Sequence, residues 1–138
     1  MWQIYALLAA LFAALTAIFA KIGIDGIDSN LATGIRTIVI LVLIWGIVFA
    51  TVSLADIKSL TATNWTFLIL SGVATGLSWL FYFKAIQLGP VSRVAPIDKL
   101  SVALTIVLSF VILGETVSWQ VVLGGFLIVS GTLVMLWK

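Results

Sequence analysis

Five long apolar stretches dominate this sequence, and each is long enough to cross a lipid bilayer. A membrane-spanning helix needs about 20 predominantly apolar residues. The stretches that meet this requirement are residues 2–20, 31–52, 65–86, 91–113 and 119–137. Because 63% of the chain is hydrophobic and only 9% is charged, no water-soluble fold could cover its apolar surface. The sequence therefore predicts a multi-pass protein whose partner is the lipid bilayer.

The pattern of apolar residues predicts helices. The stretches lack the period-2 alternation of membrane β-barrels, and open strands cannot cross lipid. Short segments rich in Gly, Pro, Asp, Ser and Thr separate the stretches and resemble helix ends. The predicted fold class is thus an all-α integral membrane protein, with five transmembrane helices in one domain over residues 1–138.

The composition also excludes several kinds of chemistry. The chain has no Cys and no His, which removes disulfides, thiolate nucleophiles, Cys/His zinc sites and the Ser-His-Asp relay. No paired carboxylates, phosphate-binding glycine loop or metal-ligand spacing occurs. The net charge of +2 is small and scattered, which argues against nucleic acid. We expect no cofactor, no metal and no enzymatic activity.

Basic residues suggest an orientation. On the side of the N-terminus the loops offer Lys58 alone, whereas the opposite side has several Lys and Arg side chains. These are Lys21, Arg36, Lys84, Arg93 and Lys138. The positive-inside rule then predicts an external N-terminus and a cytoplasmic C-terminus in the cell membrane. The apolar first stretch lacks a charged leader, so we expect it to be retained as a helix.

The fourth stretch carries a polar face headed by a carboxylate. Asp98, Ser101, Thr105 and Ser109 fall on one arc of a helix. Such a face is typical of a water-accessible path, and a carboxylate at bilayer depth costs several kcal/mol unless paired or hydrated. Alternatively, the hydroxyls bond to backbone carbonyls one turn earlier, which we favour for Ser109. Lys99 either contacts a ligand or extends to the membrane interface.

The third stretch carries an aromatic face. Thr75, Ser78, Trp79 and Tyr82 follow helical spacing, and rings with a polar group suit both a substrate pocket and the membrane interface. Trp79 lies about two turns inside the stretch, which favours the pocket.

Other residues are predicted to shape the fold. Gly89 and Pro90 form a turn, and Pro96 removes a backbone donor and kinks the fourth helix. Glu115 is expected to favour the N-terminus of the last helix electrostatically. Arg36 is expected to pair with Asp25 or Asp28, or else to face the cavity; we favour the ion pair.

Small residues at helical intervals predict close helix packing. Gly72 and Gly76 are expected to pack within the chain. For Gly124, Gly125 and Gly131 in the last stretch, an interface between subunits is an equal alternative.

Together these features resemble a known family. Gly89 and Pro90 followed by VSRVAPI, then LGE at residues 113–115 and LGGFLIVSGTLVML at 123–136, resemble the EamA domain of the drug/metabolite transporter superfamily. The segment APIDKLSV, residues 95–102, is similar to small half-length members. The resemblance runs over all five helices.

The resemblance implies one half of a ten-helix transporter fold. Full-length relatives have two such halves in opposite orientation around a cavity, and they carry small metabolites. By position, the resemblance indicates Trp79, Tyr82, Asp98 and Lys99 as substrate contacts, beside the polar Ser101 and Thr105. It also suggests an antiparallel homodimer, which conflicts with the one-sided distribution of Lys and Arg.

Three functions follow as hypotheses. The first is a dimeric secondary transporter or exporter of small polar metabolites. The second is a non-transporting subunit, or one half of a heteromeric lipid-linked-sugar flippase. The third is a cationic multidrug exporter, against which Lys99 beside Asp98 counts.

Overall fold

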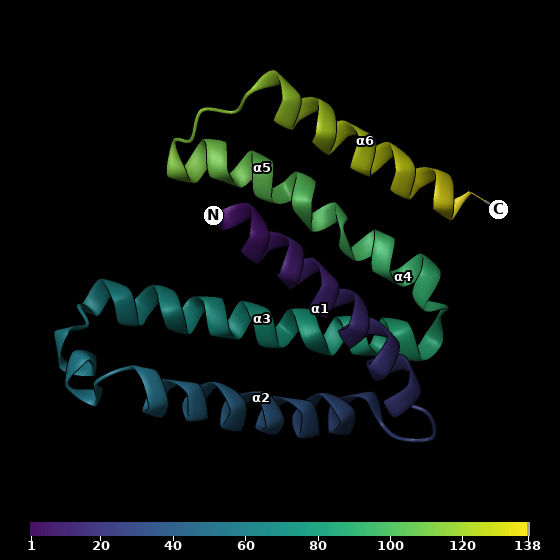
Figure 1. Cartoon of the computed structure of the whole chain (residues 1–138). Helices are drawn as coiled ribbons and strands as arrows, with labels where there is room; N and C mark the ends of the chain where they lie inside the picture. Colours follow the sequence, from purple (N-terminus) through teal and green to yellow (C-terminus); the bar gives the residue numbers. More distant parts are fainter. Residues whose placement is uncertain (138) are drawn as a thin grey trace. The chain divides into compact units, whose positions relative to one another are not determined.

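All five apolar stretches are helical in the computed structural model, which describes residues 1–137 (Figure 1). The helices are α1 (Trp2–Gly23), α2 (Ser29–Thr51), α3 (Ala62–Leu88), α4 (Val91–Asp98), α5 (Leu100–Leu113) and α6 (Trp119–Leu136). A short 3-10 helix, η1 (Leu54–Ser59), precedes α3 and was not expected from the sequence. Five segments are long and apolar enough to span a membrane, with α4 and α5 forming a single span. The predicted fold class is confirmed, whereas Lys138 lies outside the described residues.

The chain divides into two compact units, which are described separately. One comprises residues 19–87, and the other comprises residues 1–18 together with the chain from residue 88 onward. Helix α1 contributes its first part to one unit and its last turns to the other.

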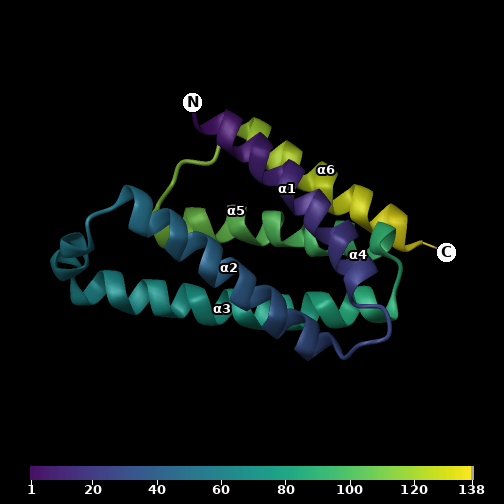
Figure 2. The ribbon, with the colours of Figure 1, turned by 60° about the horizontal axis from the view of Figure 1, so that its bottom comes forward.

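In the unit of residues 19–87, α2 and α3 run in opposite directions and are joined by η1 (Figure 1). Asp28 caps α2, because its carboxylate accepts hydrogen bonds from the backbone N–H groups of Asn30 and Leu31 at 2.8 and 3.2 Å. The two helices cross obliquely and meet where α2 begins and α3 ends (Figure 2). There Ile24, Ala32 and Phe83 form a small buried cluster.

In the other unit, α5 and α6 pack against each other as an antiparallel pair, and α4 also contacts α6 (Figure 1). Gly114 ends α5 in a left-handed conformation with φ of 66°, which glycine adopts without steric cost. The N-cap of α6 is Ser118.

The fourth span is interrupted, as Pro96 predicts. Helix α4 ends at Asp98, Lys99 forms a turn, and α5 begins at Leu100. Proline has no N–H to donate and its ring crowds the preceding turn. The chain responds with a tight turn in which the N–H of Lys99 donates to the carbonyl oxygen of Pro96 at 3.1 Å.

At Gly125, α6 packs closely against α5. The glycine is buried, and a Cβ built on it would lie 2.9 Å from Cδ1 of Ile106. Gly125 therefore contributes to packing within the chain, one of its two alternatives, and a further role in a subunit interface stays a prediction. Around Gly124 and Gly131 a Cβ would meet nothing within 4 Å, and their place in a subunit interface also stays a prediction.

Replacing Gly125 with a large residue should weaken the packing of α5 on α6. We expect Gly125→Leu to lower the free energy of unfolding by about 1–3 kcal/mol, because extra methylenes overpack a filled contact. Unfolding in mixed detergent micelles, followed by circular dichroism, measures this. Gly46→Leu is the matched control, since a Cβ at Gly46 has nothing within 4 Å. Equal effects of both substitutions would contradict this account of Gly125.

Candidate functional site

The break between α4 and α5 holds the charged pair of the fourth span. The ammonium group of Lys99 lies 3.4 Å from a carboxylate oxygen of Asp98, and both side chains are partly exposed. Seven or eight residues separate the pair from Val91, which corresponds to about 11 Å along the helix. A membrane core is about 30 Å thick, so this pair lies well below the headgroups if the span is perpendicular to the membrane. The structure thus places two of the predicted site residues, Asp98 and Lys99, in contact.

The hydroxyls that follow Asp98 are bonded to the backbone of their own helix. Thr105 Oγ1 donates to the carbonyl oxygen of Ser101 at 2.8 Å, and Ser109 Oγ donates to that of Ile106 at 3.0 Å. The alternative favoured for Ser109 is therefore confirmed, and the same bond forms at Thr105. Each hydroxyl oxygen still has a lone pair with which to accept a bond from water or a solute.

A threonine of α6 binds the carbonyl that lies just before the break. Thr132 Oγ1 is 3.2 Å from the carbonyl oxygen of Pro96 and 2.9 Å from that of Ile128. Thr132 is buried. Its one hydroxyl proton can be donated to either carbonyl in turn, and the carbonyl oxygen of Pro96 also accepts from the N–H of Lys99.

Arg36 faces aromatic rings, which corrects the favoured expectation of an ion pair. Its guanidinium carbon lies 4.2 Å from the centroid of the Trp79 ring and 5.3 Å from that of Phe83. Asp28 instead caps α2 and lies two turns away along the helix, so it is already engaged. The faces of aromatic rings attract cations, most strongly those of Trp.

Tyr82 packs at the edge of the buried cluster formed by Ile24, Ala32 and Phe83. Its ring also meets that of Phe83 edge-on, with centroids 6.5 Å apart. Trp79 and Tyr82 therefore belong to the same end of the unit of residues 19–87. Asp98, Lys99, Ser101 and Thr105 belong to the other unit.

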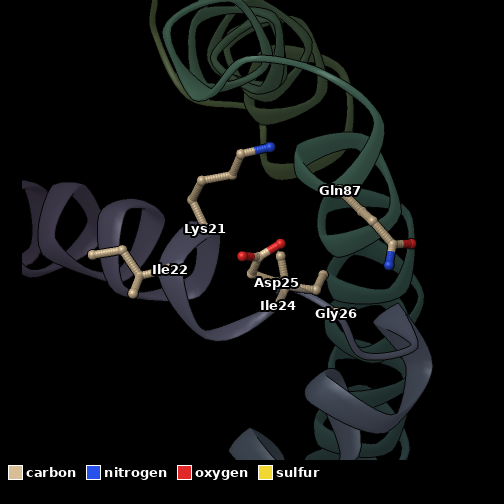
Figure 3. A pocket seen from close by; sticks show the side chains of 6 residues that line it. All are labelled: Lys21, Ile22, Ile24, Asp25, Gly26 and Gln87. Atoms are coloured by element: carbon tan, nitrogen blue, oxygen red, sulfur yellow. The ribbon is translucent and has the colours of Figure 1, made fainter.

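A pocket of about 490 Å³ lies beside the loop between α1 and α2. Lys21, Ile22, Ile24, Asp25, Gly26 and Gln87 line it. In Figure 3 the carboxylate of Asp25 lies between the backbones that carry Lys21 and Gln87, while the Lys21 side chain extends away from it.

Two bonds tie this loop region to the end of α3. The ammonium group of Lys21 donates to the carbonyl oxygen of Ile86 at 2.5 Å, where a cation favours the negative end of the helix dipole. Gln87 Nε2 donates to the carbonyl oxygen of Ile27 at 2.8 Å, and Gln87 Oε1 accepts from Lys84 at 3.2 Å.

Sequence reasoning missed Phe83, Gln87 and Thr132. Phe83 follows Trp79 by four residues, so the shared helix face was a signal for its contact with Arg36. Thr132 is one of few hydroxyls in an apolar helix, but its bond to Pro96 spans 36 residues and leaves no local pattern. The bond from Gln87 to Ile27 spans 60 residues and is equally invisible in the sequence.

The predicted turn and cap residues lie at helix ends. Pro90 is the N-cap of α4, and its carbonyl oxygen accepts from the N–H groups of Arg93 and Val94. Glu115 precedes the N-cap of α6, Ser118, by three residues, and its backbone N–H donates to the carbonyl oxygen of Ser109 at 3.2 Å. An electrostatic effect of its carboxylate on α6 stays a prediction.

Comparison with known proteins decides the family. The model of the EamA-like transporter family matches residues 1–137. The chain belongs to the EamA-like transporter family. An "Uncharacterized transporter in cobO 3'region" from Sinorhizobium sp is 48% identical over 134 residues, which cover 97% of this chain and 95% of that relative. No solved structure matches the chain.

Membership in this family agrees with the structure in two respects. Five apolar helices make the chain a multi-pass membrane protein. The relative aligns along nearly its whole length, so it too has the length of one five-helix domain.

Proposed function

We propose that this EamA-family protein is a secondary transporter of small polar metabolites, with Asp98 and Lys99 at its solute pathway. The observation that carries the proposal is the break in the fourth span, with this ion pair at the break. In secondary transporters, interrupted helices characteristically form the sites for solutes and coupling ions. Family membership supports transport itself, and the site chemistry supports a polar solute.

The energetics of the membrane favour a hydrated space at the break. A charged side chain at the centre of a bilayer costs about 2.5–3.5 kcal/mol on insertion scales, and such residues usually face a cavity. Asp98 and Lys99 offset part of this cost by pairing, but both remain partly exposed. The start of α5 adds backbone N–H groups with no side-chain cap. Water or a polar solute can satisfy these groups.

We further propose that two copies assemble into the transporter, with antiparallel copies preferred. The domain has an odd number of spans, so a copy inserted in the opposite direction supplies the inverted half that the family resemblance implies. The similar length of the Sinorhizobium relative supports a transporter built from such halves. The surplus of Lys and Arg on one side opposes dual insertion and predicts the cytoplasmic C-terminus.

The pairing of Asp98 with Lys99 disfavours a cationic multidrug exporter. A carboxylate that binds organic cations competes for them with any neighbouring ammonium group. Here that group lies at 3.4 Å. A subunit of a heteromeric lipid-linked-sugar flippase is the other alternative, and it differs from our proposal in requiring a different partner chain.

Replacing Asp98 should strongly slow transport. In proteoliposomes we expect Asp98→Asn to lower the initial uptake rate at least about tenfold, or about 1.4 kcal/mol, for any solute that the wild type carries. The reason is that Asn neither balances Lys99 nor exchanges a proton. A panel of radiolabelled amino acids and sugar phosphates, with ethidium as a cation, measures this and identifies the solute class.

The matched control is Glu115→Gln, which removes a carboxylate from the loop before α6 and should leave uptake intact. Undiminished, pH-independent uptake by Asp98→Asn would remove Asp98 from the mechanism. Ethidium as the preferred solute would instead favour the multidrug exporter.

Purified alone in a bilayer, the chain should be a dimer. Stepwise photobleaching at high lipid dilution measures the number of copies, and a persistent monomer would favour the heteromeric alternative.

Because the chain has no Cys, a single substitution such as Lys58→Cys shows on which side of the membrane residue 58 lies, without labelling at other positions. For antiparallel copies, an impermeant thiol reagent should label about half of the Lys58→Cys molecules in whole cells. All-or-none labelling would contradict dual insertion.

A further inference from the structure

Arg36 lies within the second span, and its guanidinium contacts aromatic rings of the third span. Arg36 is about 10 Å along α2 from its first residue, and Trp79 is about 13 Å from the last residue of α3. The guanidinium lies nearer to Trp79 than to Phe83, which is closer to the end of α3. The cation is therefore directed toward the middle of the span, opposite to the direction expected of a side chain that seeks the headgroups.

The ring of Trp79 contacts the face of the Arg36 guanidinium and leaves the N–H donors of the guanidinium free of that contact. A guanidinium has five N–H groups in one plane. Among residues 1–137, Arg36 makes no ion pair or hydrogen bond; it contacts the faces of Trp79 and Phe83 and interacts electrostatically with Tyr82. Unpaired donors are costly away from water, especially on a charged group. The N–H groups of the half-buried Arg36 guanidinium are thus available to donate hydrogen bonds to another group.

The polar groups closest to Arg36 along α2 are already engaged. Thr33 Oγ1 donates to the carbonyl oxygen of Ser29, and Thr37 Oγ1 donates to that of Thr33, both at 2.8 Å. The carboxylate of Asp28 caps the helix. This segment therefore offers a cation held by aromatic rings and no anion that is paired with it.

We propose that Arg36 binds the oxyanion of a solute, a carboxylate or a phosphate, with Trp79 fixing the plane of the guanidinium. A planar guanidinium matches both groups with two parallel hydrogen bonds. The contact with Trp79 restricts the side chain, so that less freedom is lost when the oxyanion binds. The inference rests on the proposed transport function and adds to it the chemical class of the solute.

Modification by phenylglyoxal tests the proposal, because the chain has only two arginines, Arg36 and Arg93. The full chain is purified in dodecyl maltoside micelles, which contain no phosphate. Rates of modification at each arginine are followed by mass spectrometry in acetate, glutamate, inorganic phosphate or chloride at equal ionic strength. Arg93 is the internal control in every sample.

We expect acetate and glutamate, or else phosphate, to slow modification of Arg36 relative to chloride and to leave Arg93 unchanged. At a solute concentration about ten times its Kd, the rate should fall about tenfold. Protection by the carboxylates assigns a carboxylate site, and protection by phosphate alone assigns a phosphate site. Equal rates in all four salts would overturn the proposal. Protection that appears only after phospholipid is added would also overturn it, because the group bound would be a lipid headgroup.

Variants at Trp79 separate the site from a general effect of salt. Trp79→Phe keeps a ring face under the guanidinium and should retain protection, whereas Trp79→Leu should raise the solute concentration needed for it several-fold. Identical protection in both variants would remove Trp79 from the site. Because the assay detects binding, protection without any uptake in proteoliposomes would refute the transport proposal and leave this one intact.

Discussion

The requirement that polar groups in lipid find partners governs this structure. In hydrocarbon, an unpaired N–H, C=O or charged group costs several kcal/mol, since no water is present to bind it. The helices satisfy most backbone groups, and hydroxyls such as those of Thr33 and Thr105 bond back to the same helices. Where the regular pattern fails, at Pro96 and at the end of α3, Thr132 and Lys21 supply donors from elsewhere in the chain. The groups that stay incompletely satisfied are therefore informative about function.

Two such places stand out, one in each compact unit. Asp98 and Lys99 are paired but partly exposed at the break of the fourth span. Arg36 is held by the faces of Trp79 and Phe83 and keeps its donors unused. A transporter needs polar groups within the span that a solute can reach, and both arrangements offer such groups. The family to which the chain belongs agrees with this interpretation.

Much of the fold could be predicted because its signals are local. Helix lengths follow from runs of apolar residues, and the interruption at Lys99 follows from Pro96. The partner of Arg36 could not be predicted in this way, since the choice between Asp28 and Trp79 depends on how α2 meets α3. The packing of Gly125 could not be predicted either, because its contact with Ile106 depends on how α6 lies against α5. The predicted substrate contacts rest on resemblance and polarity, and their roles stay predictions.

The central claim is that water reaches the polar face of the fourth span, and thiol accessibility tests it most directly. In the Cys-free chain, Ser101→Cys and Thr105→Cys should react with a charged, water-soluble thiol reagent in liposomes. Val107→Cys, on the opposite face of the same helix, should not react. Labelling of the two polar positions with Val107→Cys protected is the result that the account predicts. Protection of all three positions, or equal labelling of all three, would contradict it.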